Sequence, residues 1–308
     1  MVTHPNHTPS ITKAWVAAAR PRTLPLALAS IGLGTFLAAA DDVLNLPLAI
    51  LAMLTAVFLQ VLSNLANDYG DSIHGADHVE RLGPARAVQS GQISARAMRL
   101  AIVLVALLAA VSGIALLWLA FGSQALPLLL VFILLGAAAI GAAVTYTAGR
   151  KPYGYAGLGD IAVLIFFGWV GVLGTYFLQA RQLEWTLFLP ATSCGLLAVA
   201  VLNVNNIRDI ESDKRAGKHS IPVRLGHHRA RLYHWLLLGI AVLTAGLFVL
   251  LDYRTPWQFL FLLSIPLLWQ NGIAVARTFD PRQLNPLLKQ MSLATLFFVL
   301  TFGIGLLL

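Results

Sequence analysis

Long, uninterrupted runs of apolar residues constrain this chain more than any other feature of its sequence. A run of about 20 residues is long enough to cross a bilayer as a helix, because the hydrocarbon layer is about 30 Å thick. Nine such runs occur, at residues 23–40, 47–67, 95–119, 125–148, 157–179, 185–206, 232–251, 257–277 and 289–308. Charged residues make up 11% of the chain, whereas soluble domains contain about 25%. The sequence therefore predicts an all-α, polytopic membrane protein with nine transmembrane helices.

Positively charged residues lie almost entirely on one side of the predicted membrane. All but two of the 21 Lys and Arg residues fall on the amino-terminal side, the exceptions being Arg181 and Arg254. The positive-inside rule then places the amino terminus in the cytoplasm and, after nine crossings, the carboxyl terminus on the opposite side. These loops also account for the net charge of +8, so we expect no nucleic-acid partner.

The residues before the first run predict two further segments. Residues 1–10 are polar, and we expect them to be disordered. Residues 11–20 predict a short helix at the membrane interface that ends before Pro21. Together with the nine runs, they predict a single transmembrane domain over residues 1–308.

Two acidic stretches stand out because the chain has only 13 acidic residues. The first spans residues 64–71 and the second residues 203–213, and each lies at the end of an apolar run. Charge beside hydrocarbon is costly, so acids kept there are candidates for function. The long loops that follow, residues 70–94 and 207–230, are both expected in the cytoplasm, and we expect the functional site on that side.

An internal repeat relates the two acidic stretches. Asp68 and Asp209 are 141 residues apart, a separation of four helices, and Arg-Leu-Gly occurs at residues 81–83 and again at 224–226. Because four is an even number, both halves have the same orientation. The sequence thus predicts two parallel four-helix quasi-repeats plus a ninth helix. Many secondary transporters have inverted repeats instead, although parallel transporter repeats also exist.

Oxygen-bearing side chains recur at helical spacing in both stretches. Residues four apart share a helix face, which groups Asn64 with Asp68, Asn67 with Asp71, and Asn205 with Asp209 and Asp213. Such oxygens suit a hard cation, and Mg2+ typically binds one or two carboxylates together with substrate phosphates. Nearby bases could hold diphosphate oxygens: Arg81, Arg86, Lys151, Arg208 and Lys214. The pattern predicts metal–diphosphate chemistry on a lipid substrate.

A third segment, residues 146–160, places tyrosines beside basic residues and ends on an acid. Tyr146, Tyr153 and Tyr155 could line a site with hydroxyl groups and with π-faces that tolerate a cation. An interfacial loop with ordinary tyrosine anchoring explains the same composition, so both interpretations stay open. Asp160 is harder to explain in that way, because it opens an apolar helix and has no close partner in the sequence.

Together these motifs resemble the UbiA superfamily of intramembrane aromatic prenyltransferases. Within it the chain is most similar to the bacterial branch that prenylates 1,4-dihydroxy-2-naphthoate in menaquinone synthesis. The resemblance covers nearly the whole chain and rests on residues 20–25, 64–71, 146–160 and 202–213. It implies a nine-helix bundle in the bacterial inner membrane around a central cavity that opens sideways to the lipid bilayer, with the active site facing the cytoplasm.

The resemblance also implies roles for individual residues. Two Mg2+ ions would bridge the diphosphate to Asn64, Asp68, Asp71, Asn205, Asp209 and Asp213. The implied diphosphate contacts are Lys151, Arg208 and Lys214, and Tyr146 and Asp160 would lie near the aromatic acceptor. The expected catalytic set is Lys151, Tyr146, Asp160 and Arg208. The first two aspartates of the superfamily pattern are four residues apart, but Asp68 and Asp71 are three apart, which leaves open whether Asn67, Asp68 or Asp71 touches the metal.

The implied reaction moves a polyprenyl group from a polyprenyl diphosphate to 1,4-dihydroxy-2-naphthoate. Carbon dioxide and diphosphate leave, Mg2+ is the cofactor, and demethylmenaquinone is the product. A sibling enzyme that uses 4-hydroxybenzoate, homogentisate or haem as acceptor is the alternative within the fold. A secondary transporter is the alternative from another class, and acids at helix ends rather than at the membrane midplane argue against it.

Overall fold

The computed structural model describes residues 10–73, 86–122, 125–149 and 151–308. Nine helical segments within these ranges are long and apolar enough to cross a membrane, which confirms the predicted all-α architecture. The α-helices are α1 (Ile11–Ala19), α2 (Leu24–Ala40), α3 (Leu46–Ile73), α4 (Ala95–Phe121), α5 (Leu126–Thr145), α6 (Gly159–Val163), α7 (Gly174–Ala180), α8 (Phe188–Arg208), α9 (Ile210–Arg215), α10 (Ile221–Leu251), α11 (Ile265–Arg277) and α12 (Leu284–Leu307). A π-helix, η2 (Leu164–Leu173), joins α6 to α7, and four 3-10 turns complete the set: η1 (Pro21–Thr23), η3 (Trp185–Leu187), η4 (Pro256–Ser264) and η5 (Pro281–Gln283).

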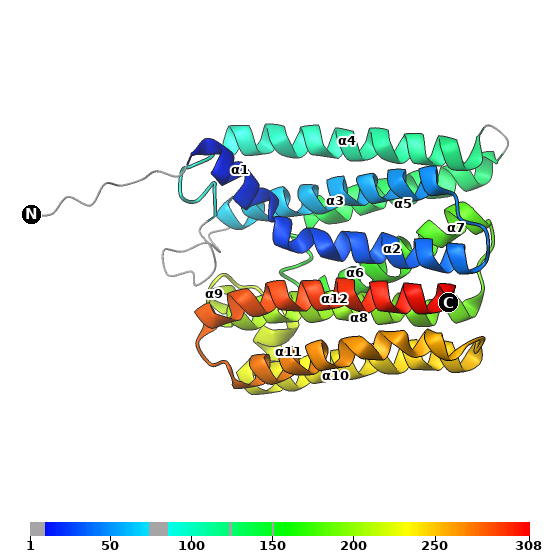
Figure 1. Ribbon diagram of the computed structural model, residues 1–308. Helices are drawn as coiled ribbons and strands as arrows, with labels where there is room; N and C mark the ends of the chain where they lie inside the picture. The colour runs from blue at the N-terminus through cyan, green and yellow to red at the C-terminus, as the bar shows by residue number, and fades with distance from the viewer. Residues whose placement is uncertain (1–9, 74–85, 123–124, 150) are drawn as a thin grey trace, which may run out of the picture.

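The long helices lie side by side along one common direction (Figure 1). α3 and α8, which carry the two acidic stretches, finish at the same end of the bundle, and we call this the polar end. α1 also lies at the polar end, whereas the carboxyl-terminal Leu308 lies at the opposite end (Figure 1). The bundle therefore brings together two acidic stretches that are far apart in the sequence.

α2 lies at the centre of the packing because it contributes to two buried clusters. The larger cluster packs α2 against η2, α8, α10 and α12, and it includes the fully buried Leu197, Phe298 and Phe302. The second cluster packs α3, α4 and α7 against the side of α2 that carries Ile31. Through α2, the two halves of the chain share a core.

α5 differs from these helices because none of its side chains is buried in protein. Leu130, Val131 and Leu134 are 52, 57 and 70% exposed. Such surface would drive aggregation in water, but in a bilayer the lipid tails solvate it and all backbone polar groups are paired within the helix. The helix therefore forms a thin wall with lipid on its outer face.

The fifth spanning segment contains a π-helical stretch that packs closely against its neighbours. Ser30 Oγ on α2 donates a hydrogen bond to the Phe167 carbonyl, at 2.5 Å. Gly168 has to be glycine, because a Cβ there would lie 2.7 Å from the Ala191 carbonyl oxygen of α8. π-Helical stretches occur often at functional sites, and here Phe166 and Phe167 line the cavity described below.

α3 and α10 depart most from their predicted bounds. α3 continues to Ile73 rather than ending at residue 67, so Asp68 and Asp71 lie on the helix, as their spacing predicts. α10 begins at Ile221 rather than at residue 232, and α9 occupies part of the predicted 207–230 loop. Charged residues in the first turns of α10 lower the hydropathy without disfavouring a helix, and the helix is interrupted at Gly226 (φ 73°).

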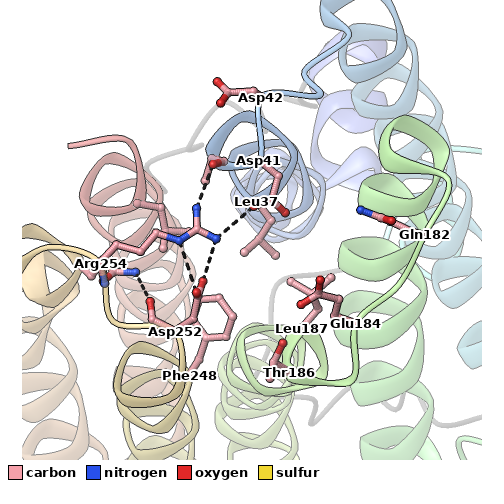
Figure 2. A pocket seen from close by; sticks show the side chains of 13 residues that line it. Leu37, Asp41, Asp42, Gln182, Glu184, Thr186, Leu187, Phe248, Asp252 and Arg254 are labelled. Carbon is pink, nitrogen blue, oxygen red and sulfur yellow. Dashed lines mark hydrogen bonds and ion pairs between the residues drawn. The ribbon is translucent and has the colours of Figure 1, made fainter.

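Arg254 joins the two halves at the end of the bundle opposite the polar end (Figure 2). Its Nη2 lies 3.2 Å from Asp41 Oδ1, after α2, and 3.1 Å from Asp252 Oδ2, after α10. Tyr176 donates a hydrogen bond to the other Asp41 oxygen, at 2.7 Å. The Arg254 side chain is half exposed, so these pairs contribute little to stability and mainly fix the loops.

Candidate active site

A cavity of about 500 Å³ lies between α2, α3, α4, α5, α8 and the segment from α6 to α7. Its polar lining includes Asn64, Asn67, Asp71, Arg86, Tyr146, Asn205, Asn206 and Lys218. Its apolar lining includes Ile31, Leu117, Phe132, Ile133, Phe166 and Leu178. Because the first set comes from the polar end and the second from the helix interiors, the cavity suits a molecule with a polar head and an apolar tail.

α3 turns the residues of the first acidic stretch in two directions. Asn67 and Asp71 line the cavity, as does Asn64, but Asp68 does not. The Asp68 carboxylate instead accepts hydrogen bonds from the Ala87 and Val88 backbone N–H groups, both at 3.1 Å. Asp68 therefore orders the turn that carries Arg86, while Asn67 and Asp71 present oxygens to the cavity.

The two asparagines of α3 hold neighbouring segments in place. Asn64 Nδ2 donates to the Ala19 carbonyl at 2.9 Å and to Thr23 Oγ1 at 3.0 Å, which fixes the junction between α1 and α2. Asn67 Oδ1 accepts a hydrogen bond from Thr147 Oγ1 at 2.9 Å. Both amides therefore position the walls of the cavity as well as facing it.

Arg208 organises the second acidic stretch. Its Nε and Nη2 donate to the two Asp209 carboxylate oxygens at 2.8 and 2.6 Å, a bidentate pair. Nη2 also donates to Asn205 Oδ1, and Nη1 donates to Asn285 Oδ1 at the start of α12, both at 2.8 Å. Arg208 is only 3% exposed, so it neutralises Asp209 and joins α8 to α12.

Lys218 bridges the two acidic stretches. Its ammonium lies 3.3 Å from Asp213 Oδ1 and 3.9 Å from Asp71 Oδ1. It also lies 5.2 Å from the centre of the Tyr155 ring, and the Tyr155 hydroxyl donates to Asp71 Oδ1 at 3.3 Å. The other Asp71 oxygen pairs with Arg86 Nη2 at 2.6 Å. Four segments thus meet around one carboxylate at the polar end of the cavity.

These groups have perturbed acidities because they are buried together. Burial raises the pKa of Asp213 to about 6, although Lys218 opposes the rise. Burial alone would lower the pKa of Lys218, but attraction by Asp71 and Asp213 outweighs it and holds the pKa above its usual range. Burial and the nearby Asp71 raise the pKa of Tyr155. At neutral pH Lys218 is therefore a cation and Tyr155 a hydrogen-bond donor.

The loop over residues 146–158 lies between the two acidic stretches. Gly70 permits the contact with α3, because a Cβ at Gly70 would lie 2.6 Å from the Thr147 carbonyl carbon and oxygen. On the other side, the His219 N–H donates to the Tyr155 carbonyl at 2.8 Å. Tyr146 lines the cavity, and its ring meets the Tyr153 ring edge-on at 5.4 Å. The loop is therefore part of the site as well as a connection.

Asp160 has a partner that the sequence did not suggest. Tyr233 on α10 donates a hydrogen bond to Asp160 Oδ2 at 2.9 Å, and Asp160 is only 6% exposed. The cavity lining reaches Ala162 and Val163 on the same helix but does not include Asp160. In this arrangement Asp160 holds α6 against α10, beside the cavity.

Two of the predicted bases lie on the surface rather than in the cavity. Lys151 and Lys214 are exposed and are not part of the cavity lining. Arg81 lies outside the described residues. Sequence reasoning in turn missed Lys218, which it counted only among the basic loop residues. The available signal was its position five residues after Asp213, in a short segment that contains Gly217.

The donor atoms fit a hard metal ion, although they are not arranged as a finished site. No group of three carboxylate, imidazole or thiol side chains in the described ranges converges tightly enough to hold one. The cavity nonetheless offers oxygens from Asn67, Asp71 and Asn205, and buried Asp213 Oδ2 has no hydrogen-bond partner. An orphaned carboxylate oxygen is costly unless a cation or a donor reaches it, so the residues present fit a metal with oxygen ligands.

Comparisons with known proteins identify sequence relatives and proteins of the same fold. Residues 26–302 match the UbiA prenyltransferase family. The 1,4-dihydroxy-2-naphthoate octaprenyltransferase of Escherichia coli (strain K12) is 46% identical over 296 residues, covering 96% of each chain. The enzyme of the same name from Mycobacterium tuberculosis is 41% identical and covers 93% of this chain and 94% of its own. The structure of a UbiA homolog from Archaeoglobus fulgidus bound to DMAPP and Mg2+ superposes with a TM-score of 0.67 at 18% identity, covering 95% and 98% of the two chains.

Proposed function

Because the chain belongs to the UbiA prenyltransferase family, we propose that it transfers a polyprenyl group from a polyprenyl diphosphate to 1,4-dihydroxy-2-naphthoate. Carbon dioxide and diphosphate are released, and the quinol form of demethylmenaquinone is the product. The acceptor follows from relatives that are 41 to 46% identical along nearly their whole length. The observation that carries the proposal is the cavity, whose acidic and basic groups gather at one end of an apolar space.

The polar end of the cavity binds the diphosphate. Among the described bases predicted from the sequence, Arg86 lines the cavity. Arg208 does not line it but donates a hydrogen bond to Asn205, which does. Lys151 and Lys214 are proposed as further contacts that turn inward from exposed positions, and Arg81 as another. Guanidinium groups pair with phosphate oxygens at two points and thereby hold the leaving group in one orientation.

Mg2+ is the proposed cofactor, with candidate ligands Asn64, Asp68, Asp71, Asn205, Asp209 and Asp213. When bound, it supplies positive charge that stabilises the departing diphosphate. Asp71 and Asp213 are the acids best placed for this, since Asp71 lines the cavity and Asp213 has an orphaned oxygen. Asp68 and Asp209 then act indirectly. Asp68 positions the turn that carries Arg86, and Asp209 positions Arg208.

The remaining residues orient the two reactants and exclude water. The bond between the prenyl carbon and the diphosphate oxygen breaks, and the allylic cation is attacked by the ring carbon that bears the carboxylate. Loss of carbon dioxide returns an electron pair to the ring and restores its aromaticity. Tyr146 and Tyr153 line the polar end of the cavity, where their π-faces tolerate a cation. The apolar walls exclude water, which would otherwise quench that cation.

The proposed setting is the bacterial inner membrane, with the polar end in the cytoplasm and the carboxyl terminus on the opposite side. The distribution of Lys and Arg residues supports this orientation. The chain acts as a single transmembrane domain, and the lipid bilayer both solvates its outer surface and supplies the prenyl donor.

A labelled acceptor tests the reaction directly. Protein purified in detergent is incubated with Mg2+, an octaprenyl diphosphate and naphthoate labelled at the carboxyl carbon. We expect labelled carbon dioxide and prenylated quinol to appear together and both to disappear with a chelator. Prenylation of 4-hydroxybenzoate without reaction of the naphthoate would assign the chain to a sibling acceptor, and no prenylation of either acceptor would contradict the proposal.

A further inference from the structure

Three acids at the polar end, Asp71, Asp209 and Asp213, pair with bases from the chain itself. Asp209 pairs with Arg208 at 2.6 Å and Asp71 with Arg86 at 2.6 Å, and Lys218 lies near Asp71 and Asp213 together. Lys218 differs from the two arginines because it contacts both acidic stretches at once. Its side chain is 12% exposed, so the charge is held within the protein rather than in solvent.

Lys218 and a divalent cation need the same carboxylate oxygens. The ammonium lies nearest Asp213 Oδ1 and Asp71 Oδ1, the acids that are best placed to bind a metal. A metal bound between these carboxylates would bring a double positive charge close to the ammonium. In a buried site such repulsion is screened only weakly, so Lys218 has to leave before both acids can hold the metal.

The released ammonium has a destination within the same cavity. Lys218 lines the cavity beside Asp71, Asn205 and Asn206, at the end where the diphosphate is proposed to bind. A lysine side chain is long and flexible, and its ammonium is a compact point charge that binds phosphate readily. Turning away from Asp213 therefore carries the positive charge toward the anion.

We propose that Lys218 is an exchangeable counter-ion, which balances Asp71 and Asp213 until a divalent metal displaces it and which then pairs with the diphosphate. This inference rests on the proposed function and adds a coupling between its two ligands. Bound metal drives Lys218 toward the diphosphate, and bound diphosphate draws Lys218 away from the carboxylates that hold the metal. Linkage makes this coupling reciprocal. Lys218 thus disfavours metal binding alone and favours the complex that contains both ligands.

The test compares the wild type with Lys218→Met, which keeps the side-chain length and removes the charge. Mn2+ serves as the metal probe and inorganic pyrophosphate as the anion, with the full chain in detergent. We expect Lys218→Met to bind Mn2+ alone about tenfold more tightly and to bind pyrophosphate at saturating Mn2+ about tenfold more weakly. A purely structural role for Lys218 would weaken both, so the opposite signs identify the exchange.

Two further variants control the measurement. Lys289→Met removes one positive charge from an exposed position and should leave both affinities unchanged. Lys218→Arg keeps a cation and should keep both affinities within about threefold of wild type, compared with the tenfold shifts expected for the neutral variant. If Lys218→Met fails to fold, as judged by its thermal unfolding, Lys218→Gln takes its place and the same two shifts are expected.

Unchanged or weaker Mn2+ binding in the neutral Lys218 variants would overturn the exchange, as would unchanged pyrophosphate binding. Neither measurement contains the naphthoate acceptor. A chain that shows both shifts but does not prenylate the naphthoate would therefore refute the proposed acceptor and leave the exchange standing.

Discussion

At the scale of single residues, Asp68 and Asp71 show how neighbours divide one motif between two tasks. Residues three apart on a helix differ by about 60° in direction, which turns Asp71 toward the cavity and Asp68 toward the 86–90 turn. Asp68 accepts hydrogen bonds from two backbone N–H groups, whereas Asp71 pairs with Arg86, Tyr155 and Lys218. One carboxylate therefore supports the backbone and the other carries the chemistry.

Substituting the two acids in turn separates these tasks. Asp71→Asn should lower turnover by about 100-fold or more, because it removes a charge proposed to bind metal. Asp68→Asn should cost about 1–3 kcal/mol of stability, because its amide N–H would face a backbone N–H. Thermal unfolding in detergent and steady-state kinetics measure the two effects. An Asp71→Asn variant with normal turnover would contradict the assignment of Asp71.

At the scale of elements, the 146–158 loop depends on a close approach to α3. Gly70 has no side chain to separate α3 from Thr147, and Thr147 Oγ1 donates to both the Ala66 carbonyl and Asn67 Oδ1. The same loop bonds to His219 on its other side. Its position therefore fixes the distance between Asp71 and the segment that carries Asp213 and Lys218.

Adding one methyl group tests this contact. Gly70→Ala should destabilise the protein by about 1–3 kcal/mol through overpacking and should lower activity, because the loop moves away from α3. Gly141→Ala is the matched control: nothing lies within 4 Å of a Cβ there. Alanine in place of this helical glycine should be neutral or stabilise by up to about 1 kcal/mol. Equal melting temperatures for the two variants would show that the Gly70 contact does not hold the loop.

At the scale of the whole molecule, the two halves are packed unequally around α2. α8, α10 and α12 bury a continuous core, whereas α5 has lipid on one face and the cavity on the other. Small residues in the second half of α5 leave room for an apolar chain, and the bilayer rather than a protein core solvates the outside of the helix. α5 contacts α3 and α4, but none of its side chains is buried, so the cavity beside it stays open.

A larger side chain in the apolar part of the cavity should weaken binding of the prenyl chain but not of the diphosphate. Gly136 on α5 lines the cavity ten residues before Tyr146, well away from the polar end. Gly136→Phe should raise the KM for a long prenyl diphosphate by about tenfold, which corresponds to about 1.4 kcal/mol of lost binding, while pyrophosphate binding stays within twofold. Competition between pyrophosphate and the prenyl donor measures both. A similar loss of pyrophosphate affinity would indicate that the diphosphate and the prenyl chain do not bind in separate parts of the cavity.

The sequence determined the membrane class, the nine spanning segments and the two acidic stretches. Each of these depends on properties that act along the chain: length, hydropathy and helical spacing. The same properties misplaced the start of α10, because a run of charged residues lowers the hydropathy of a helix without preventing it. They also indicated Asp68 and Asp71 without separating them, since the division depends on the backbone of Ala87 and Val88.

Only the tertiary structure decided which of these groups meet. Lys218 pairs with Asp71, 147 residues earlier in the chain, and Tyr233 pairs with Asp160 across two helices. Such contacts depend on how helices pack and on where glycines let backbones approach, and neither can be read from a local pattern. Composition and spacing fixed which side chains are available, but ion pairing acts over a few ångströms, so packing alone decided which charges balance one another.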